Sequence, residues 1–362
     1  MQSKCLLWSI APILMIFHIN VMAQKSISGI VRDKATGLPI PDVYAYLDGT
    51  SFVTITNDSG AFYLNAGKII NAKLIFYHMM YEKITIDQPF EKKSIEVDLI
   101  EKNIELGEVV IKTGPFARKE KLKAFEKQFL GDNKAGKSCK ILNKDDLYLF
   151  FDEEEKTLNA KCVEPLIVQN EFLGYKMHFT LTDFNIRYLT KSIKDGQIEY
   201  SLMRGSVFFE DIAPNNPVIN KRRIDAYKGS LVCFFKNLAN NTLEKSGHII
   251  YNHRNNYQIH EIQQANPASF FFVTEKGADK NLIIKSNSGI NTLTYNTYKF
   301  PLPIYGVITV VDPTKGLSEI IFLTNEFIVD PFGLIDKRDY IYVSGSMSNQ
   351  RVGNMVPLDF EF

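Results

Sequence analysis

The amino-acid sequence predicts a mainly β protein with some helix, built from an N-terminal seven-stranded β-sandwich and a larger, mostly antiparallel α+β domain. Two observations support this fold class. Apolar residues recur at every second position through much of the first hundred residues, with turn-forming clusters between them, and a period of two is typical of half-buried strands. Later segments of the same kind alternate with a few stretches whose apolar residues follow the helical period.

The strands of the first domain are expected within residues 24–100. Alternation is clearest at 27–31, 43–47 and 95–99, and shorter strands are expected at 62–64, 74–77 and 83–86. Turn clusters lie between them at 33–41, 48–50 and 57–60. Short strands with frequent turns between them predict a β-sandwich.

One of these turns, Asn57-Asp58-Ser59-Gly60, can be interpreted in detail. Asn and Asp tolerate left-handed backbone conformations, and glycine adopts a positive φ without steric cost. We therefore interpret Asp58 as a turn residue and not as a ligand.

The first residues predict export. Lys4 is followed by an apolar stretch over 6–19 and by Val21-Met22-Ala23, the order of a secretory signal peptide. The apolar stretch is shorter than the roughly 20 residues of a membrane-spanning helix. We expect a signal peptide at 1–23 with cleavage before Gln24, and a periplasmic or outer-membrane-associated location. A lipid anchor is not expected, because cysteine does not follow the cleavage site.

The second domain is expected at 116–362, after a linker at 101–115. It begins with an amphipathic helix over 117–130, in which Leu122, Phe125 and Phe129 share one face and Gly131 ends the helix. A helical pair at 221–227 and 230–243 interrupts the sheet, and strands resume from His248. The strands before that pair are expected at 147–151, 157–163, 165–168, 175–181 and 198–209.

Composition excludes some classes of partner. Lys plus Arg number 42 against 41 Asp plus Glu, so no basic excess favours nucleic-acid binding. Three cysteines follow the signal peptide, Cys139, Cys162 and Cys233. We expect small buried side chains, with at most one disulfide because their number is odd.

No residue is predicted to be catalytic, to bind a cofactor or to bind a metal. The histidines fall in neither HxxE nor HExxH spacing, and no GxSxG is present. His78 and Glu82 flank a strand-like stretch, which separates them. Cys233 lies in an apolar helical stretch where a thiol is inert, and the acidic residues 152–155 are expected at the tip of a hairpin. Enzymatic activity is therefore not expected.

Residues 29–62 carry a pattern that identifies the first domain. Gly29-x-Val31-x-Asp33, Thr36-Gly37-x-Pro39-Ile40 and Thr54-x-Thr56-x-Asp58-x-Gly60-x-Phe62 resemble the carboxypeptidase regulatory-like domain. The resemblance covers about residues 25–100. It implies a transthyretin-like sandwich that is a non-catalytic attachment in its family.

Two further resemblances place the chain in the cell envelope. The segment 106–111, LGEVVI, resembles the one that follows this sandwich in TonB-dependent transporters of Bacteroidota, although the remaining length is too short for a full transporter barrel. Within this chain we interpret 108–111 as a short strand or linker. Phrases such as EPLIVQNEFLGYKMHFTLTDF resemble a Bacteroidota envelope family whose second domain has no assigned function.

The sequence thus predicts an exported envelope protein that is a non-enzymatic binding or assembly module, with an envelope protein or glycan as partner. Two alternatives stay open. Val356, Leu358, Phe360 and Phe362 alternate as in the last strand of a small outer-membrane β-barrel, which would also fit a TonB-system accessory protein. A hydrolase with an unrecognised site would require distant histidines and carboxylates to converge.

Overall fold

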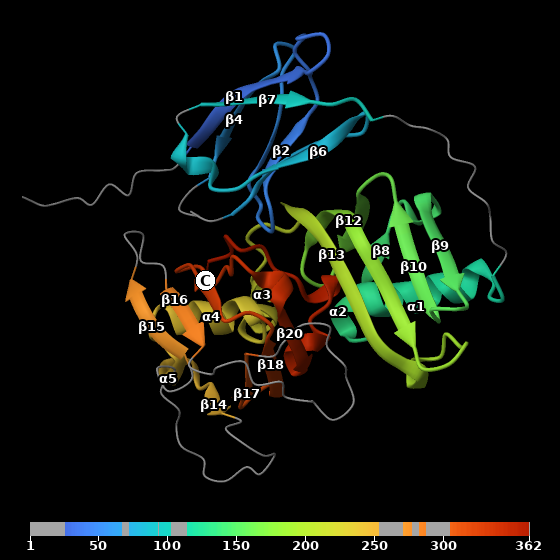
Figure 1. Cartoon of the computed structure of the whole chain (residues 1–362), viewed down its shortest axis with the longest axis vertical. Coiled ribbons are helices and arrows are strands. Elements are labelled where there is room, and N and C mark those ends of the chain that lie inside the picture. Colours follow the sequence, from blue (N-terminus) through green and yellow to red (C-terminus); the bar gives the residue numbers. More distant parts are fainter. Residues whose placement is uncertain are drawn as a thin grey trace, which may run out of the picture.

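The structure is a computed structural model that describes residues 26–66, 72–92, 94–102, 114–252, 271–276, 282–286 and 305–361 (Figure 1). The expected signal peptide at 1–23, most of the linker at 101–115, and His253 and His260 lie outside the described residues. The fold class is confirmed: the chain is mainly β, with several antiparallel sheets and few helices.

The N-terminal part is a seven-stranded sandwich of two sheets. One sheet has the order β4-β1-β7 and the other β3-β2-β5-β6. Alternate residues of each strand point into a shared core that includes Val31, Phe62 and Phe76, as the period of two requires. The strands are β1 (Ser26–Asp33), β2 (Tyr44–Leu47), β3 (Val53–Ile55), β4 (Ala61–Asn65), β5 (Leu74–His78), β6 (Tyr81–Ile86) and β7 (Ile95–Leu99), with a 3₁₀ turn η1 at Pro89–Glu91.

The turn between β3 and β4 forms as the sequence predicts. Gly60 has φ +68°, and its N–H donates to the carbonyl of Asn57 at 2.8 Å. The Asn57 side chain accepts from the N–H groups of Ser59 and Ala61. Asp58 is exposed at the tip of this turn, consistent with a turn residue.

A six-stranded antiparallel sheet with one covering helix follows the sandwich. Its main path is β8-β11-β12-β10-β9, and β13 pairs with the long strand β12. Phe125 and Phe129 of α1 pack on Phe179 and Phe184 of β12, so the predicted helical face is the buried one. The elements are α1 (Arg118–Leu130), α2 (Lys134–Lys137), β8 (Cys139–Ile141), η2 (Lys144–Asp146), β9 (Leu147–Asp152), β10 (Thr157–Cys162), β11 (Leu166–Asn170), β12 (Tyr175–Tyr188), η3 (Asp195–Gln197) and β13 (Ile198–Asp211).

The predicted acidic hairpin tip is confirmed. Strands β9 and β10 pair from Asp152↔Thr157 onward, and residues 153–156 form the turn. The carboxylate of Asp152 accepts from the N–H groups of Glu154 and Glu155. These residues shape a turn.

The rest of the chain forms a second core beyond residue 114, separate from that of the six-stranded sheet. Phe234 and Phe235 pack there with Phe322 and Phe327, between the helices and two sheets of order β14-β17-β18-β20 and β15-β16-β19. The elements are α3 (Pro217–Lys228), α4 (Leu231–Ala239), α5 (Leu243–Ser246), β14 (Ile249–Asn252), β15 (Phe271–Lys276), β16 (Leu282–Ser286), β17 (Gly306–Asp312), β18 (Gly316–Phe322), β19 (Glu326–Val329), η5 (Arg338–Tyr340), β20 (Ile341–Gly345), η6 (Ser346–Asn349) and η7 (Val352–Asn354).

The strand suggested by the alternation near the C-terminus does not form. Residues 355–361 contain no strand, and Leu358 instead lies against the sandwich core. No helix in the described part of the chain is both long and apolar enough to cross a bilayer.

Candidate functional site

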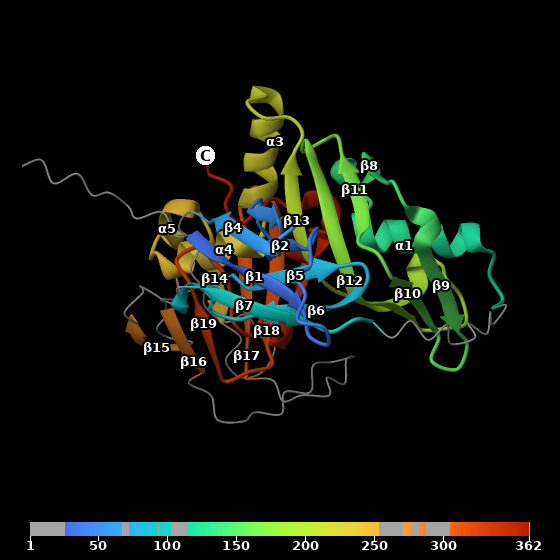
Figure 2. The ribbon, with the colours of Figure 1, turned by 90° about the horizontal axis from the view of Figure 1, so that it is seen from above.

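The sandwich packs against the rest of the chain through the turn after β2, at residues 48–51. In both views the sandwich lies over the upper end of β13 and the C-terminal region (Figures 1 and 2). The N–H of Gly49 donates to the carbonyl of Val207 at 2.7 Å, and the N–H of Phe209 donates to the carbonyl of Thr50 at 3.0 Å. Thr50 and Phe208 form a parallel bridge. The turn thus adds a short extended segment to the free edge of β13, and we call this contact region the seam.

Two tyrosines of the sandwich reinforce the seam. Tyr46 is buried, and its hydroxyl lies 2.9 Å from Ser206 Oγ of β13. Tyr77 donates to the carboxylate of Glu164 at 2.6 Å. Burial raises the pKa of Tyr46 to about 12, and burial together with Glu164 raises the pKa of Tyr77. Both hydroxyls therefore remain protonated and serve as hydrogen-bonding groups at neutral pH.

Asp48 places a carboxylate within the seam. Its Oδ1 accepts from the N–H of Val207 at 2.8 Å. Burial raises the pKa of Asp48, and this hydrogen bond and the cations Arg338 and Lys83 oppose that rise. The Asp48 carboxylate therefore binds the edge of β13, although its burial disfavours the charged form.

The C-terminal segment fastens the other side of the same turn. The N–H of Leu358 donates to the carbonyl of Gly49 at 2.8 Å, and Asp359 accepts from the N–H of Ser51 at 2.8 Å and from its hydroxyl. The side chains of Phe332, Leu334 and Leu358 pack on the sandwich core. The seam therefore joins the sandwich to both parts of the chain beyond residue 114.

The loop that carries Phe332 and Leu334 is held by a buried aspartate. Asp330 is fully buried, and its Oδ1 accepts from the N–H groups of both residues at 2.8 Å. Within the described residues, no hydrogen-bonding group reaches its Oδ2. Burial raises the pKa of Asp330 to about 6, because the charged form is poorly solvated there.

His178 lies beside the seam and is paired. Its Nε2 lies 2.6 Å from Glu210 Oε1, and its ring stacks on Phe208 at 4.4 Å. Burial lowers the pKa of His178, and Glu210 opposes that effect. The aromatic stack and the carboxylate hold this histidine in a fixed orientation on the sheet.

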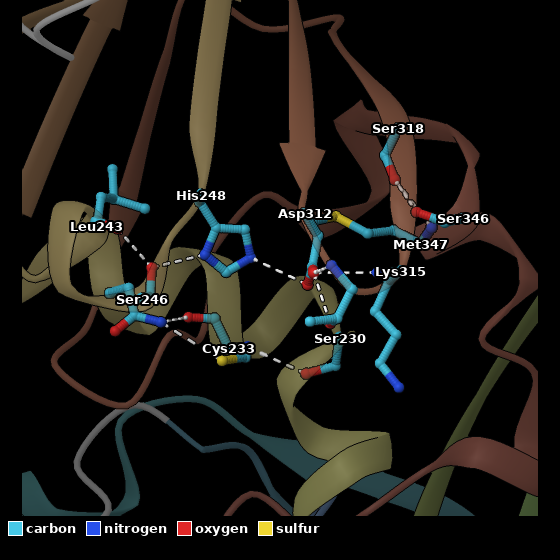
Figure 3. A network of polar contacts seen from close by, with 12 residues as sticks. Ser230, Cys233, Leu243, Ser246, His248, Asp312, Lys315, Ser318, Ser346 and Met347 are labelled. Atoms are coloured by element: carbon cyan, nitrogen blue, oxygen red, sulfur yellow. Dashed lines mark hydrogen bonds and ion pairs between the residues drawn. The ribbon is translucent and has the colours of Figure 1, made fainter. Parts of the chain in front are cut away.

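A second polar network lies in the last core, around His248 (Figure 3). The Nδ1 of His248 lies 2.6 Å from Ser246 Oγ, and its Nε2 lies 3.7 Å from Asp312 Oδ2. Ser246 ends α5, His248 directly precedes β14, and Asp312 ends β17. Serine, histidine and aspartate are thus connected in the order of a hydrolase triad.

The hydrogen bond that Ser246 donates is incompatible with the chemistry of a hydrolase triad. The hydroxyl of Ser246 donates to the carbonyl of Leu243 at 2.6 Å. Because a hydroxyl has only one proton, the hydrogen bond between Ser246 Oγ and His248 Nδ1 must use a proton carried by Nδ1. A ring nitrogen that carries a proton cannot accept the serine proton, as a general base must. Within the described residues, Nε2 has no hydrogen-bond partner. The network therefore binds the end of a helix to a strand and leaves the serine unactivated.

The two titratable groups of this network, His248 and Asp312, both have lowered pKa values, for different reasons. Burial lowers the pKa of His248, against the attraction of Asp312. Burial alone would raise the pKa of Asp312, but hydrogen bonds from Thr314 and Lys315 outweigh it and lower that pKa. A neutral histidine beside a carboxylate is the state that these environments favour near neutral pH.

The cysteines correct part of the sequence prediction. All three are free thiols, and Cys139 and Cys162 are only partly buried; the possible disulfide does not form. Cys233 is buried in α4, as expected, and burial raises its pKa to about 11. A thiol with that pKa is a poor nucleophile at neutral pH.

The histidines in the described part of the chain do not come together in one site. His78 is in β5, where its Nδ1 accepts from the N–H of Met80, whereas His178 is in β12 and His248 lies between α5 and β14. The described residues contain no group of three side chains that could hold a metal ion. Sequence reasoning missed the seam and the Ser246–His248–Asp312 network, because their partners are far apart along the chain or carry no motif.

Comparison with known families supports the interpretation of the sandwich. Residues 27–111 match the model of the CarboxypepD_reg-like domain. This is a non-catalytic domain type, and the match confirms the resemblance that the turn and strand positions indicate. Comparison with curated proteins gives no match.

Proposed function

We propose that this chain is an exported protein of the Bacteroidota cell envelope that acts as a non-enzymatic binding or assembly module. The seam is the observation that carries the proposal. The carboxypeptidase regulatory-like sandwich joins the edge of β13 through main-chain hydrogen bonds and the C-terminal segment through Leu358 and Asp359. On this proposal, the non-catalytic sandwich fixes the positions of the two cores that follow it in the chain.

The chemistry of the polar clusters supports a role without catalysis. Ser246 directs its proton to a carbonyl, Cys233 is a buried thiol, and His178 is held by Glu210 and Phe208. Each cluster is accounted for by the packing of its own elements. A hydrolase would need at least one of these groups to be activated and open to a substrate.

The partner that we propose is an envelope protein or glycan. Nucleic acid is a poor candidate because acidic and basic residues balance. Export follows from the composition of residues 1–23, and the outer membrane or the periplasm is the corresponding location.

The proposal can be tested by cross-linking in intact cells followed by fractionation of the envelope. We expect the chain in the envelope or periplasmic fraction, cross-linked to a defined partner. Purified protein should retain the same partner from detergent-solubilised envelope. A chain that stays in the cytoplasm, or that is monomeric and retains nothing from the envelope, would contradict the proposal.

A matched pair of variants tests the role of the seam in binding. Asp359→Ala removes the acceptor for Ser51, whereas Asp58→Ala changes an exposed turn aspartate of the sandwich. If the sandwich organises the binding surface, Asp359→Ala lowers the recovery of the partner and Asp58→Ala does not. Equal recovery with both variants would separate the seam from binding.

A further inference from the structure

The outer edge of β13 offers main-chain groups next to the seam. The N–H and the carbonyl of Val207 both face the sandwich, where Asp48 and Gly49 bind them. In an antiparallel sheet, alternate residues of an edge strand direct these groups away from the neighbouring strand. Two register shifts interrupt this pair: one places the extra residue on β12, between Leu181 and Asp183, and the other leaves Glu199 of β13 unpaired. The alternation of β13 is therefore regular from Val207 back to Ser201, and Ser201, Met203 and Gly205 share the side of Val207.

Below the seam this edge is unpaired in the described part of the chain. There, no main-chain or side-chain group bonds the outward N–H and carbonyl groups of Ser201, Met203 and Gly205. Gly205 and its neighbour Arg204 are exposed. In Figure 1, β13 continues well beyond the sandwich along the side of the sheet. An unpaired edge of this length is a template for another extended chain.

The charges beside the edge are already neutralised. Arg204 lies 3.9 Å from Asp183 and 3.6 Å from Asp339. A charged residue often protects an edge strand against pairing, but here the neighbouring carboxylates offset the charge of Arg204. An incoming segment would therefore be recognised through its main chain and not through a strong net charge.

We propose that the edge of β13 over residues 201–205 binds an extended segment of a partner protein by strand addition. This inference rests on the proposed binding function and names the class of partner, a polypeptide. The interface already present supports it, since the turn at 48–51 binds the same edge at Val207 and Phe209 through main-chain hydrogen bonds. The new segment would continue that pairing down the strand, and such pairing is a common mode of peptide recognition.

The experiment places a photo-cross-linking amino acid at Arg204 in the full-length chain, in intact cells. A control chain carries it at Lys161, an exposed position of β10 in the same sheet. We expect position 204 to cross-link one envelope protein within a single short segment. Position 161 should give no such product.

A proline at Met203 tests whether the main chain is the recognised group. Met203→Pro removes the outward N–H, and proline is tolerated in edge strands where the N–H faces solvent. Met203→Ala loses the same side-chain packing but keeps the N–H. Relative to Met203→Ala, we expect Met203→Pro to lower the cross-link yield at position 204 about tenfold, as the loss of one or two main-chain hydrogen bonds predicts.

A second measurement avoids reliance on a variant that fails to fold. A synthetic peptide of the cross-linked segment, added to the wild-type chain, should slow hydrogen exchange at the amides of Ser201, Met203 and Gly205. Unchanged exchange, equal cross-linking of the two Met203 variants, or a cross-link from position 204 to a second copy of this chain would each overturn the inference. A partner captured only from position 161 would overturn it and leave the proposed function standing. No partner from either position, with nothing retained from solubilised envelope, would count against both.

Discussion

Replacing Asp330 with asparagine should stabilise the protein at neutral pH and much less at acidic pH. The side chain is fully buried, and its pKa is raised from 3.8 to about 6 by burial. For a carboxyl whose pKa is raised by folding, the contribution to stability is full below the unfolded pKa and is lost as the pH rises through the folded pKa. The loss between pH 4 and pH 8 corresponds to about 2.4 kcal/mol.

Asparagine keeps the hydrogen-bond acceptor Oδ1 of this side chain. Its Oδ1 can still accept from the N–H groups of Phe332 and Leu334, while the amide removes the buried charge at Oδ2. At pH 8 we expect the free energy of unfolding to rise by about 1–2 kcal/mol, because the relief of the buried charge is partly offset by amide N–H groups that find no acceptor where Oδ2 stood. At pH 4.5 the carboxyl is already mostly neutral, so the two proteins should differ by less than about 1 kcal/mol.

The measurement is chemical denaturation of the full chain at pH 4.5 and pH 8, with Asp312→Asn as the matched control. Hydrogen bonds from Thr314 and Lys315 lower the pKa of Asp312, so its carboxylate stabilises the fold at pH 8 and that contribution is lost as the pH falls through the folded pKa. Asp312→Asn should therefore destabilise the protein at pH 8. An Asp330→Asn variant that is destabilised at pH 8, or shifted equally at both pH values, would refute the reasoning.

Three further predictions concern the seam and the thiols. Gly49→Ala should destabilise the protein by about 1–3 kcal/mol, because Gly49 has φ +77° and an added Cβ would lie 2.8 Å from Leu358. Gly37→Ala is the control: Gly37 has φ +72°, but an added Cβ would meet no atom within 4 Å. Its loss of stability therefore measures the backbone cost alone. Equal losses in denaturation would show that the Leu358 contact is unimportant. Tyr46→Phe should lower the free energy of unfolding by about 1 kcal/mol through the lost contact with Ser206, and an unchanged midpoint would contradict that contact. Alkylation of Cys233 at pH 7.5, followed by mass spectrometry, should be negligible in the folded chain and rapid in denaturant, since burial raises its pKa to about 11; rapid labelling of the native protein would show that the thiol is accessible.

The sandwich could be predicted from the sequence because its signals are local. Alternation over a few residues specifies which side of each strand is buried, and turn residues such as Gly60 specify where the chain reverses. The same holds for α1, whose stripe of Phe125 and Phe129 meets the sheet. None of these inferences needs a partner distant in the chain.

The seam could not be predicted in the same way. Tyr46 and Ser206 are separated by 160 residues, and Ser51 and Asp359 by 308. A tyrosine, a serine or an aspartate in such a position has no distinguishing pattern along the sequence. Only the folded chain shows that the turn at 48–51, which looks like an ordinary hairpin connection, carries the contacts between the sandwich and the rest of the protein.

The C-terminal residues show why alternation alone does not specify a strand. Leu358 reaches the sandwich core, while its neighbour Asp359 turns to Ser51. Leu358 and Asp359 lie in a turn, which the N–H of Phe360 closes by donating to the carbonyl of Pro357 at 3.0 Å. Successive side chains there face different surfaces without any strand pairing. The main chain of Leu358 bonds to Gly49, so this short segment supports one side of the turn while β13 supports the other. Removing either support leaves the sandwich attached on one side only, and for that reason the seam, more than any single polar cluster, should govern how the sandwich is held against the rest of the protein.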